Sequence, residues 1–327
     1  MRVLVTGGTG FTGTHLTRRL LRDGHEVVTI DTQPGLFAAD LGRLGATLLL
    51  GSVADRDLVA RAMEGCDVVF HLAAAFRKVN LPRAEYPRTN VEGTRAVLEA
   101  ALRHGVANVV YCSTCGVHGD VKSWPADETA PIAPEDYYQS TKYGGERVVQ
   151  EFVARGQGAV ILRPAAIYGP GDPERFLMLF RRVRSGRFPM FGDGRAHYHP
   201  LYVDNLIDAF VLAAQSDRRR GDAYLIADEQ YYTLDDLVRA IGDALGIAVE
   251  IRHYPFRPLW LAALACETVY KILPLEPPLF RRRVDWFRQN RAFDIRKARV
   301  ELGYEPKVTL REGLRATAAW YRAQRYL

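Results

Sequence analysis

A tyrosine and a lysine four residues apart are the pair in this sequence best suited to proton transfer. Tyr138 and Lys142 share one face of any helix that contains both. A phenol with an ordinary pKa of about 10 is a weak base at neutral pH, but a neighbouring ammonium favours the phenolate and lowers that pKa. Tyr138 could then take a proton from a substrate hydroxyl while hydride leaves the same carbon. The pair predicts oxidation of an alcohol, or the reverse reduction of a ketone.

A third polar side chain, Thr114, follows a strand predicted over 109–112. At the end of that strand, its hydroxyl is placed to hydrogen-bond the reacting oxygen. Lys142 could also hold the ribose beside the nicotinamide of a bound dinucleotide. Tyr137 has no lysine four residues further on, and we interpret it as a spectator next to Tyr138.

The first thirteen residues predict the hydride carrier, because they form a short apolar strand, a glycine-rich turn and the start of a helix. Gly7 permits a tight turn, Gly10 lets the backbone approach a diphosphate, and Gly13 lets the helix pack near the strand. The helix over 11–22 points its positive end at the phosphates. Asp31 ends the next apolar strand, where it can accept hydrogen bonds from the adenosine ribose and would repel a 2′-phosphate. NAD is therefore favoured over NADP.

Strands and helices alternate through the first half of the chain, which is typical of a parallel sheet with helices on both faces. The strands are uninterrupted apolar runs, as expected when both of their faces are buried. We predict strands over 2–5, 26–30, 47–50, 68–71, 109–112 and 160–163, and helices over 11–22, 55–63, 89–104 and 138–155. The predicted fold class is α/β, a Rossmann doubly wound parallel sheet.

The alternation ends after residue 163, and the remainder is mixed. Residues 1–165, with 203–227 returning to them, are predicted to form an NAD-binding Rossmann domain. Residues 166–202 and 228–327 are predicted to form a smaller, discontinuous α+β substrate lobe.

The composition is that of a globular protein, with 48% hydrophobic and 25% charged residues. No apolar run is long enough to span a bilayer. No export signal precedes the first strand, and four cysteines are not a disulfide framework, so we expect a cytoplasmic location. No spacing of histidine, cysteine or acidic residues predicts a metal site.

The positive charge is concentrated in one segment. Residues 281–299 hold eight basic and two acidic residues, a surplus equal to the net charge of +6 of the whole chain. The first interpretation is a solvated face, and the second is a site for an anionic substrate or a lipid headgroup surface. Peripheral membrane contact thus stays open. Nucleic-acid binding is not expected, because no binding motif accompanies the charge.

In combination, these patterns resemble the short-chain dehydrogenase/reductase superfamily, specifically its extended branch of NAD-dependent epimerase/dehydratase enzymes. The resemblance covers nearly the whole chain. Besides the glycine turn and the Thr, Tyr and Lys residues, matching segments are His71-Leu72-Ala73-Ala74, Thr89-Asn90-Val91-Glu92-Gly93-Thr94, Leu162-Arg163-Pro164 and Leu302-Gly303-Tyr304. The resemblance implies bound NAD, a small-molecule substrate and a homodimer formed through the helices over 89–104 and 138–155.

The residue pattern and the resemblance together predict the ligand contacts. The predicted cofactor contacts are Gly7, Gly10, Phe11, Thr12, Gly13, Asp31, Ser52, Val53, Leu72, Ala73, Ala74, Asn90, Tyr138 and Lys142. The predicted substrate contacts are Ala75, Ala166, Tyr168, Arg175 and Tyr198. Ala166 and Tyr198 stand where many nucleotide-sugar enzymes of the family carry Asn and Arg, which weakens a nucleotide-sugar assignment.

Two further comparisons with the family pattern narrow the reaction. Dehydratases of the family carry an Asp-Glu pair directly after the threonine, where this chain has Cys115 and Gly116, so dehydration is not favoured. The segments 163–173 and 259–265 look more like the 3β-hydroxysteroid dehydrogenase and dihydroflavonol-reductase branches. Our hypothesis is an NAD-dependent oxidoreductase that interconverts a secondary alcohol and a ketone on a bulky, hydroxysteroid- or sterol-like substrate. The alternatives are a nucleotide-sugar 4-epimerase and a non-catalytic NAD-binding protein.

Overall fold

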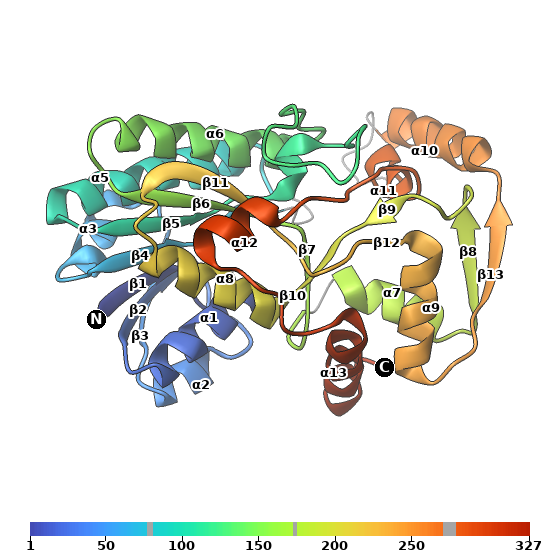
Figure 1. The fold of residues 1–327 in the computed structure, drawn as a ribbon, viewed down its shortest axis with the longest axis horizontal. Coiled ribbons are helices and arrows are strands. Elements are labelled where there is room, and N and C mark those ends of the chain that lie inside the picture. Colours follow the sequence, from blue (N-terminus) through green and yellow to red (C-terminus); the bar gives the residue numbers. More distant parts are fainter. Residues whose placement is uncertain (77–80, 173–174, 271–278) are drawn as a thin grey trace.

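A seven-stranded parallel sheet forms the centre of the larger part of the molecule (Figure 1). The computed structural model describes residues 1–76, 81–172, 175–270 and 279–327. The strand order is β11-β6-β5-β4-β1-β2-β3, so the direction of winding reverses between β1 and β4. The strands are β1 (Arg2–Thr6), β2 (Glu26–Asp31), β3 (Thr47–Leu50), β4 (Val68–His71), β5 (Asn108–Cys112), β6 (Ala159–Pro164) and β11 (Arg220–Ile226). The predicted doubly wound parallel sheet is confirmed.

Helices cover both faces of the sheet, because successive strand residues point to opposite sides. Val3 and Val5 of β1 join a core with one set of helices, and Leu4 joins a core with the other set. The first set contains α1 (Phe11–Arg22), α8 (Val203–Gln215) and α12 (Arg296–Leu302). The second contains α3 (Arg56–Met63), α5 (Thr94–His104) and α6 (Tyr137–Val153). A short helix, α2 (Ala38–Arg43), connects β2 to β3.

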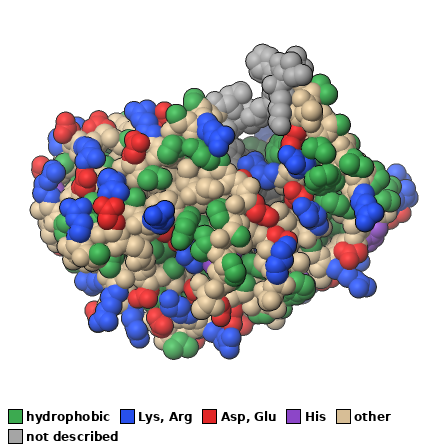
Figure 2. Space-filling model, turned by 90° about the horizontal axis from the view of Figure 1, so that it is seen from above, with side chains coloured by type: hydrophobic (Ala, Val, Ile, Leu, Met, Phe, Trp, Pro, Cys, Tyr) green, Lys and Arg blue, Asp and Glu red, His purple; other side chains and the backbone are tan. Residues whose placement is uncertain are grey.

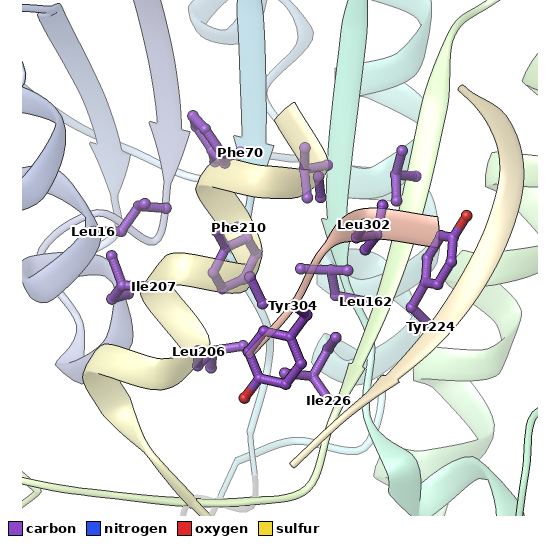
Figure 3. Close-up of a cluster of buried hydrophobic side chains, with 14 of the residues drawn as sticks. Leu16, Phe70, Leu162, Leu206, Ile207, Phe210, Tyr224, Ile226, Leu302 and Tyr304 are labelled. Carbon is purple, nitrogen blue, oxygen red and sulfur yellow. The ribbon is translucent and has the colours of Figure 1, made fainter. Parts of the chain in front are cut away.

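One of these cores brings together segments far apart in the sequence (Figure 3). Phe70 of β4 packs edge to face with Phe210 of α8, with ring centres 6.2 Å apart. Tyr304 follows α12, is fully buried, and donates its hydroxyl to the carbonyl oxygen of Ala227 at 2.9 Å. This packing holds β11 and α8 against the strands of the first half. The exact domain limits drawn from the sequence stay a prediction.

The remaining elements form a smaller region beside the carboxyl ends of the strands, on the right of Figure 1. Its paired strands are β7 (Ala166–Tyr168) with β10 (Pro200–Tyr202), β8 (Arg187–Phe191) with β13 (Glu250–Tyr254), and β9 (His197–Tyr198) with β12 (Tyr232–Thr233). Its helices are α7 (Arg175–Val183), α9 (Leu234–Leu245), α10 (Phe256–Tyr270), α11 (Arg281–Asp285) and α13 (Leu310–Ala323). Helices α7, α9 and α13 enclose an apolar core of their own.

The segment predicted as one helix over 89–104 is more complex. A short helix α4 (Glu85–Pro87) leads into a π-helix η1 (Arg88–Gly93), and α5 then continues as an ordinary α-helix. Such π-helical turns are rare and are frequently found at functional sites. Within the described residues, no helix is both long and apolar enough to cross a membrane.

Candidate active site

Helix α6 presents Tyr138, Lys142 and Glu146 on one face, because four residues separate each from the next. Its first turn is fixed by a capping box. The carboxylate of Asp136 accepts the N–H of Gln139 at 2.8 Å, and the side-chain oxygen of Gln139 accepts the N–H of Asp136 at 3.2 Å. This reciprocal pair sets where the helix begins, and therefore where Tyr138 stands.

Helix α6 lies very close to β5 at Gly145. A Cβ at this position would lie 2.1 Å from the hydroxyl oxygen of Tyr111. That hydroxyl donates to the backbone carbonyl of Lys142 at 3.1 Å, and the Lys142 ammonium lies 4.2 Å from the centre of the same ring. Gly145 and Tyr111 therefore place the lysine over the carboxyl half of β5.

The Lys142 ammonium is buried, and no described residue accepts a hydrogen bond from it. Its side chain is 1% exposed, and its Nζ has no hydrogen-bond partner within the described part of the chain. Burial lowers the pKa of Lys142 to about 8, although nearby Cys112 and Glu146 act in the opposite direction. Buried polar groups usually have partners, because an unpaired one is costly. Lys142 is thus suited to donate to a ligand.

Glu146 connects α6 to two strand ends. Its carboxylate accepts the hydroxyl of Ser113 after β5, and the Nε and Nη2 of Arg163 on β6 at 3.0 and 2.7 Å. Arg163 also donates from Nη1 to the Nε2 of His118 at 3.1 Å, and His118 Nδ1 donates to the carbonyl of Ala130 at 3.1 Å. Burial lowers the pKa of His118, in keeping with this neutral ring. The whole cluster is buried, which makes it a rigid clamp.

Thr114 directly follows the clamped Ser113 and begins a short 3₁₀ turn, η2 (Cys115–His118). Its Oγ1 accepts the N–H of Gly116 at 3.0 Å, so the hydroxyl can still donate its proton. Cys115 is buried, its Sγ lies 2.9 Å from a backbone carbonyl of β6, and burial raises the pKa of its thiol well above the usual value. Thr114 is therefore positioned for a ligand oxygen, and Cys115 is unsuited to acid–base work.

A buried chain of hydrogen bonds supports the loop after β4. The N–H of Ala73 donates to Thr6 Oγ1 at 3.2 Å, and that hydroxyl donates to His71 Nδ1 at 2.7 Å. His71 Nε2 lies 2.9 Å from Thr94 Oγ1, which in turn donates to the carbonyl of Asn90 at 2.8 Å. Burial, with a smaller contribution from the Lys142 ammonium, lowers the pKa of His71 to about 3. Because His71 is neutral, its Nδ1 accepts the Thr6 hydroxyl and its Nε2 donates to the Thr94 hydroxyl oxygen. All hydrogen bonds of this chain therefore point the same way.

Asn90 completes this support from the π-helix η1. Its Oδ1 accepts the N–H of Ala75 at 2.8 Å, and its Nδ2 donates to the carbonyl of Ala75 at 3.2 Å and to Thr141 Oγ1 at 2.9 Å. The amide is thus occupied by the loop and by α6. Asn90, predicted as a cofactor contact, holds the loop that includes Ala73 and Ala74.

The glycine turn has the geometry that the sequence suggested. Gly7 has a φ of +70°, and a Cβ there would lie 2.9 Å from a backbone nitrogen after β4. A Cβ at Gly13 would lie 2.0 Å from the Gly7 carbonyl, whereas Gly10 is exposed and no atom approaches its Cβ position closer than 3.4 Å. No side chain caps the start of α1, which leaves its first N–H groups open to an anion. The Asp31 carboxylate accepts the Thr9 hydroxyl at 2.8 Å at the end of β2.

The other predicted cofactor contacts surround this turn. Phe11 and Thr12 begin α1 and are half-buried, as are Leu72 and Ala74. Ser52 uses its hydroxyl to accept the N–H of the second residue after it at 3.1 Å. Val53 is buried where Gly93 lets η1 approach it closely.

The predicted substrate contacts are spread over different environments. Ala75 is buried, and Ala166 is half-buried two residues beyond β6. Tyr168 and Tyr198 pack within the apolar core of the smaller region, and Tyr168 is fully buried and stacked on a phenylalanine 4.7 Å away. This placement gives both tyrosines a packing role. The backbone of Arg175 begins α7, and its side chain lies outside the described part of the structure.

A family model for the "NAD dependent epimerase/dehydratase family" matches residues 3–227, more than half of the chain. The chain belongs to this family. It is 32% identical to a 2-alkyl-3-oxoalkanoate reductase of Stenotrophomonas maltophilia, over 98% of this chain and 99% of that protein. It is 33% identical to a 3 beta-hydroxysteroid dehydrogenase/Delta 5-->4-isomerase of Mycobacterium tuberculosis, over 98% of this chain and 90% of that protein. A crystal structure of Thermotoga maritima UDP-glucose 4-epimerase with UDP-glucose is similar, with a TM-score of 0.80, 27% identity and 99% of both chains covered.

Membership makes the protein an NAD-dependent enzyme, with oxidoreductase or epimerase activity at the level of the family. The residues present fit NAD. The uncapped start of α1 suits a diphosphate, the Asp31 carboxylate suits a ribose hydroxyl, and the buried, unpaired Lys142 suits a second ribose hydroxyl.

The sequence interpretation missed the residues that hold the site together. Glu146 stands four residues after Lys142, so its place on the same face of α6 as Tyr138 and Lys142 was readable from spacing alone. Its partners Ser113 and Arg163 come from two other elements, and only the fold brings them to it. The role of His71 was equally hidden, because its neutral state depends on burial.

Proposed function

We propose that this enzyme interconverts a secondary alcohol and a ketone on a bulky, partly apolar substrate. Tyr138 exchanges the proton with the substrate oxygen, Thr114 donates a hydrogen bond to that oxygen, and Lys142 supplies the positive charge that favours the phenolate. The observation that carries the proposal is the buried Lys142 ammonium, one helical turn from Tyr138 and without a hydrogen-bond partner in the described structure. When bound, NAD supplies the hydride acceptor.

The chain's own residues account for the proton. In alcohol oxidation, the phenolate of Tyr138 accepts the proton of the substrate hydroxyl, and in ketone reduction its phenol returns a proton to the new alkoxide. Glu146 keeps Ser113, and with it the start of η2, against α6. The distance between the Thr114 hydroxyl and Tyr138 is therefore set by a buried ionic clamp rather than by a mobile loop.

An apolar substrate is supported by one contact and by the relatives. The ring of Phe76 packs edge to face against the Tyr138 ring, with centres 4.9 Å apart, so the wall beside the phenol is aromatic. Relatives that cover 98% of this chain are named for a 2-alkyl-3-oxoalkanoate and for a 3 beta-hydroxysteroid. We therefore favour a hydroxyl or ketone on a hydrocarbon skeleton. A homodimer formed through α5 and α6, and a cytoplasmic location, also stay proposals.

The test is turnover of hydroxysteroids and 3-oxoalkanoates by the purified wild-type enzyme, followed by NADH absorbance. Tyr138→Phe removes the phenol, and Tyr137→Phe is the matched control on the neighbouring, exposed tyrosine. We expect turnover to be lost only in Tyr138→Phe, with NAD binding retained by both variants. Equal turnover in both variants would refute the proposed role of Tyr138.

A second function, epimerisation of a nucleotide sugar, is favoured by the structural likeness to UDP-glucose 4-epimerase over 99% of both chains. It would use the same tyrosine, lysine and threonine without net change of the cofactor. Nucleotide extracted from the denatured, freshly purified protein separates the two. Near-stoichiometric NAD together with conversion of a UDP-sugar would support the epimerase. Reversible NAD binding together with net NADH formation would support the dehydrogenase.

A further inference from the structure

Helix α10 exposes a stripe of apolar side chains where a surface helix normally carries charge. Of its fifteen residues, Ala263 alone is fully buried. The outward stripe contains Leu261, Ala262, Ala265 and Val269, and the Leu261 and Val269 side chains are 59% and 57% exposed. Arg257 lies on the same face of α10, near the start of the helix. Exposed apolar patches on folded proteins are typical of interaction sites.

Several arginines belong to α10 and to the neighbouring α11. Helix α11 is joined to α10 because Arg281 donates its N–H and Nε to Glu267 at 2.7 and 2.8 Å. Arg257 and Arg283 are exposed and have no ion-pair partner within the described residues. An open depression of about 480 Å³ is lined by Phe256, Arg257, Trp260, Leu261 and Arg288. Figure 2 shows hydrophobic and basic side chains side by side on the right of this face, where α10 and α11 lie.

We propose that the α10–α11 surface (residues 256–270 and 281–288) docks on the headgroup region of an anionic lipid bilayer. Apolar side chains flanked by arginines match that environment, since the stripe can enter the acyl boundary while the guanidinium groups pair with lipid phosphates. The sequence of this surface contains five arginines and two carboxylates. A symmetric contact with a second copy would bring the same arginines face to face, and this like-charge repulsion opposes such a dimer.

The docking surface adjoins the start of the catalytic helix. Arg282 of α11 lies 3.6 Å from the carboxylate of Asp136, the residue that caps α6 two positions before Tyr138. Just beyond α11, Gln289 donates to the carboxylate of Glu135 at 2.7 Å. Binding through α10 would therefore bring the Tyr138 end of α6 near the bilayer, where apolar alcohols and ketones partition.

Flotation of the full-length protein with vesicles tests this inference without any substrate. The vesicles are phosphatidylcholine alone and phosphatidylcholine mixed with phosphatidylglycerol. We expect the wild type to float with the anionic vesicles, and to dissociate as salt is raised. Arg257→Gln and Arg283→Gln should each weaken binding roughly fivefold, because each arginine near an anionic surface contributes about 1 kcal/mol. Leu261→Glu should weaken it at least as much, by placing a carboxylate in the stripe.

Matched controls lie on surfaces away from α10. Val300→Glu adds the same charge on α12 at a side chain that is 84% exposed, and Arg311→Gln and Arg315→Gln remove the same charge from the exposed face of α13. The controls should float like the wild type.

No flotation with anionic vesicles, or equal losses in the α10 and control variants, would overturn the inference. A self-association of the wild type that Leu261→Glu abolishes would also overturn it, in favour of a second copy. None of these outcomes bears on turnover, so the proposed function is tested separately.

Discussion

Helix α6 buries polar side chains, whereas helix α10 exposes apolar ones. On α6, Gln139, Lys142 and Glu146 are buried, and each is committed to the geometry of the site. On α10, the apolar residues of the outward stripe are exposed. Both helices depart from the usual amphipathic pattern. A polar ligand would compensate for the buried polar groups of α6, and an apolar environment would compensate for the exposed apolar groups of α10. Local conflicts of this kind are where function is expected in a folded chain.

The largest expected effect separates activity from stability on α6. Lys142→Met should lower kcat by about 10²–10⁴, because the charge that favours the Tyr138 phenolate is lost. The same change should raise the free energy of unfolding by about 1–3 kcal/mol, because a buried ammonium that has no hydrogen-bond partner among the described residues is replaced by an apolar side chain of similar size. Steady-state kinetics and urea unfolding measure the two effects. A variant that is both inactive and less stable would contradict this account of Lys142.

The next effect concerns the clamp behind the site. Glu146→Gln should destabilise the protein by about 3–5 kcal/mol, because it leaves the Arg163 guanidinium buried without its carboxylate. Ser113→Ala keeps that ion pair and serves as the milder variant. It should lower kcat more than it raises KM, because it releases the strand end that carries Thr114. A Ser113→Ala enzyme with wild-type kcat would show that the clamp is only structural.

The pH dependence tests the state of Lys142 directly. The pKa of Lys142 is lowered by burial to about 8, so the ammonium is present below that pH and is lost above it. We therefore expect kcat/KM for alcohol oxidation to fall as the pH rises above about 8. Lys142→Arg keeps its charge at all these pH values, so whatever activity it retains should lack this alkaline fall. A wild-type profile that continues to rise up to the ordinary lysine pKa of about 10.4 would argue against the role of the ammonium.

The smallest expected effect is on α10. Leu261→Ser should change the free energy of unfolding by about 0.5 kcal/mol or less, because the side chain is already exposed to water. Phe152→Ala on α6 removes a fully buried ring and should cost about 3–5 kcal/mol in the same urea experiment. A large loss of stability in Leu261→Ser would mean that the α10 stripe is covered within the folded chain, and would weaken the membrane proposal.

Much of the larger region could be predicted because its signals are local. The six strands expected in the first half agree with the structure to within two residues at each end, and α1 was predicted at its observed limits. In the smaller region, the sequence did not predict how the strands pair. Its strand pairs β7–β10 and β8–β13 each join segments more than thirty residues apart, and no local signal indicates which of these segments pair.

The residues of the candidate site also fall into those that local sequence patterns predicted and those that only the fold placed. Gly7, Gly13 and the Tyr138–Lys142 spacing were readable because each depends on backbone conformation within a turn or a helix. Tyr168 and Tyr198 pack in the apolar core of the smaller region, which the sequence did not indicate, because an aromatic residue in a short strand carries no sign of the side to which it points. Their predicted contact with the substrate stays a prediction.

The sequence by itself determined which candidate groups are present and their order along the chain: a glycine turn, a threonine at a strand end, and a tyrosine and lysine on one helix face. Only the tertiary structure decided the electrostatic state of these groups. Burial by β5 gives Lys142 its lowered pKa, and burial between β1, β4 and η1 keeps His71 neutral. The physical reason is that propensity and spacing act within one element, whereas desolvation and ion pairing depend on segments that only the folded chain brings together.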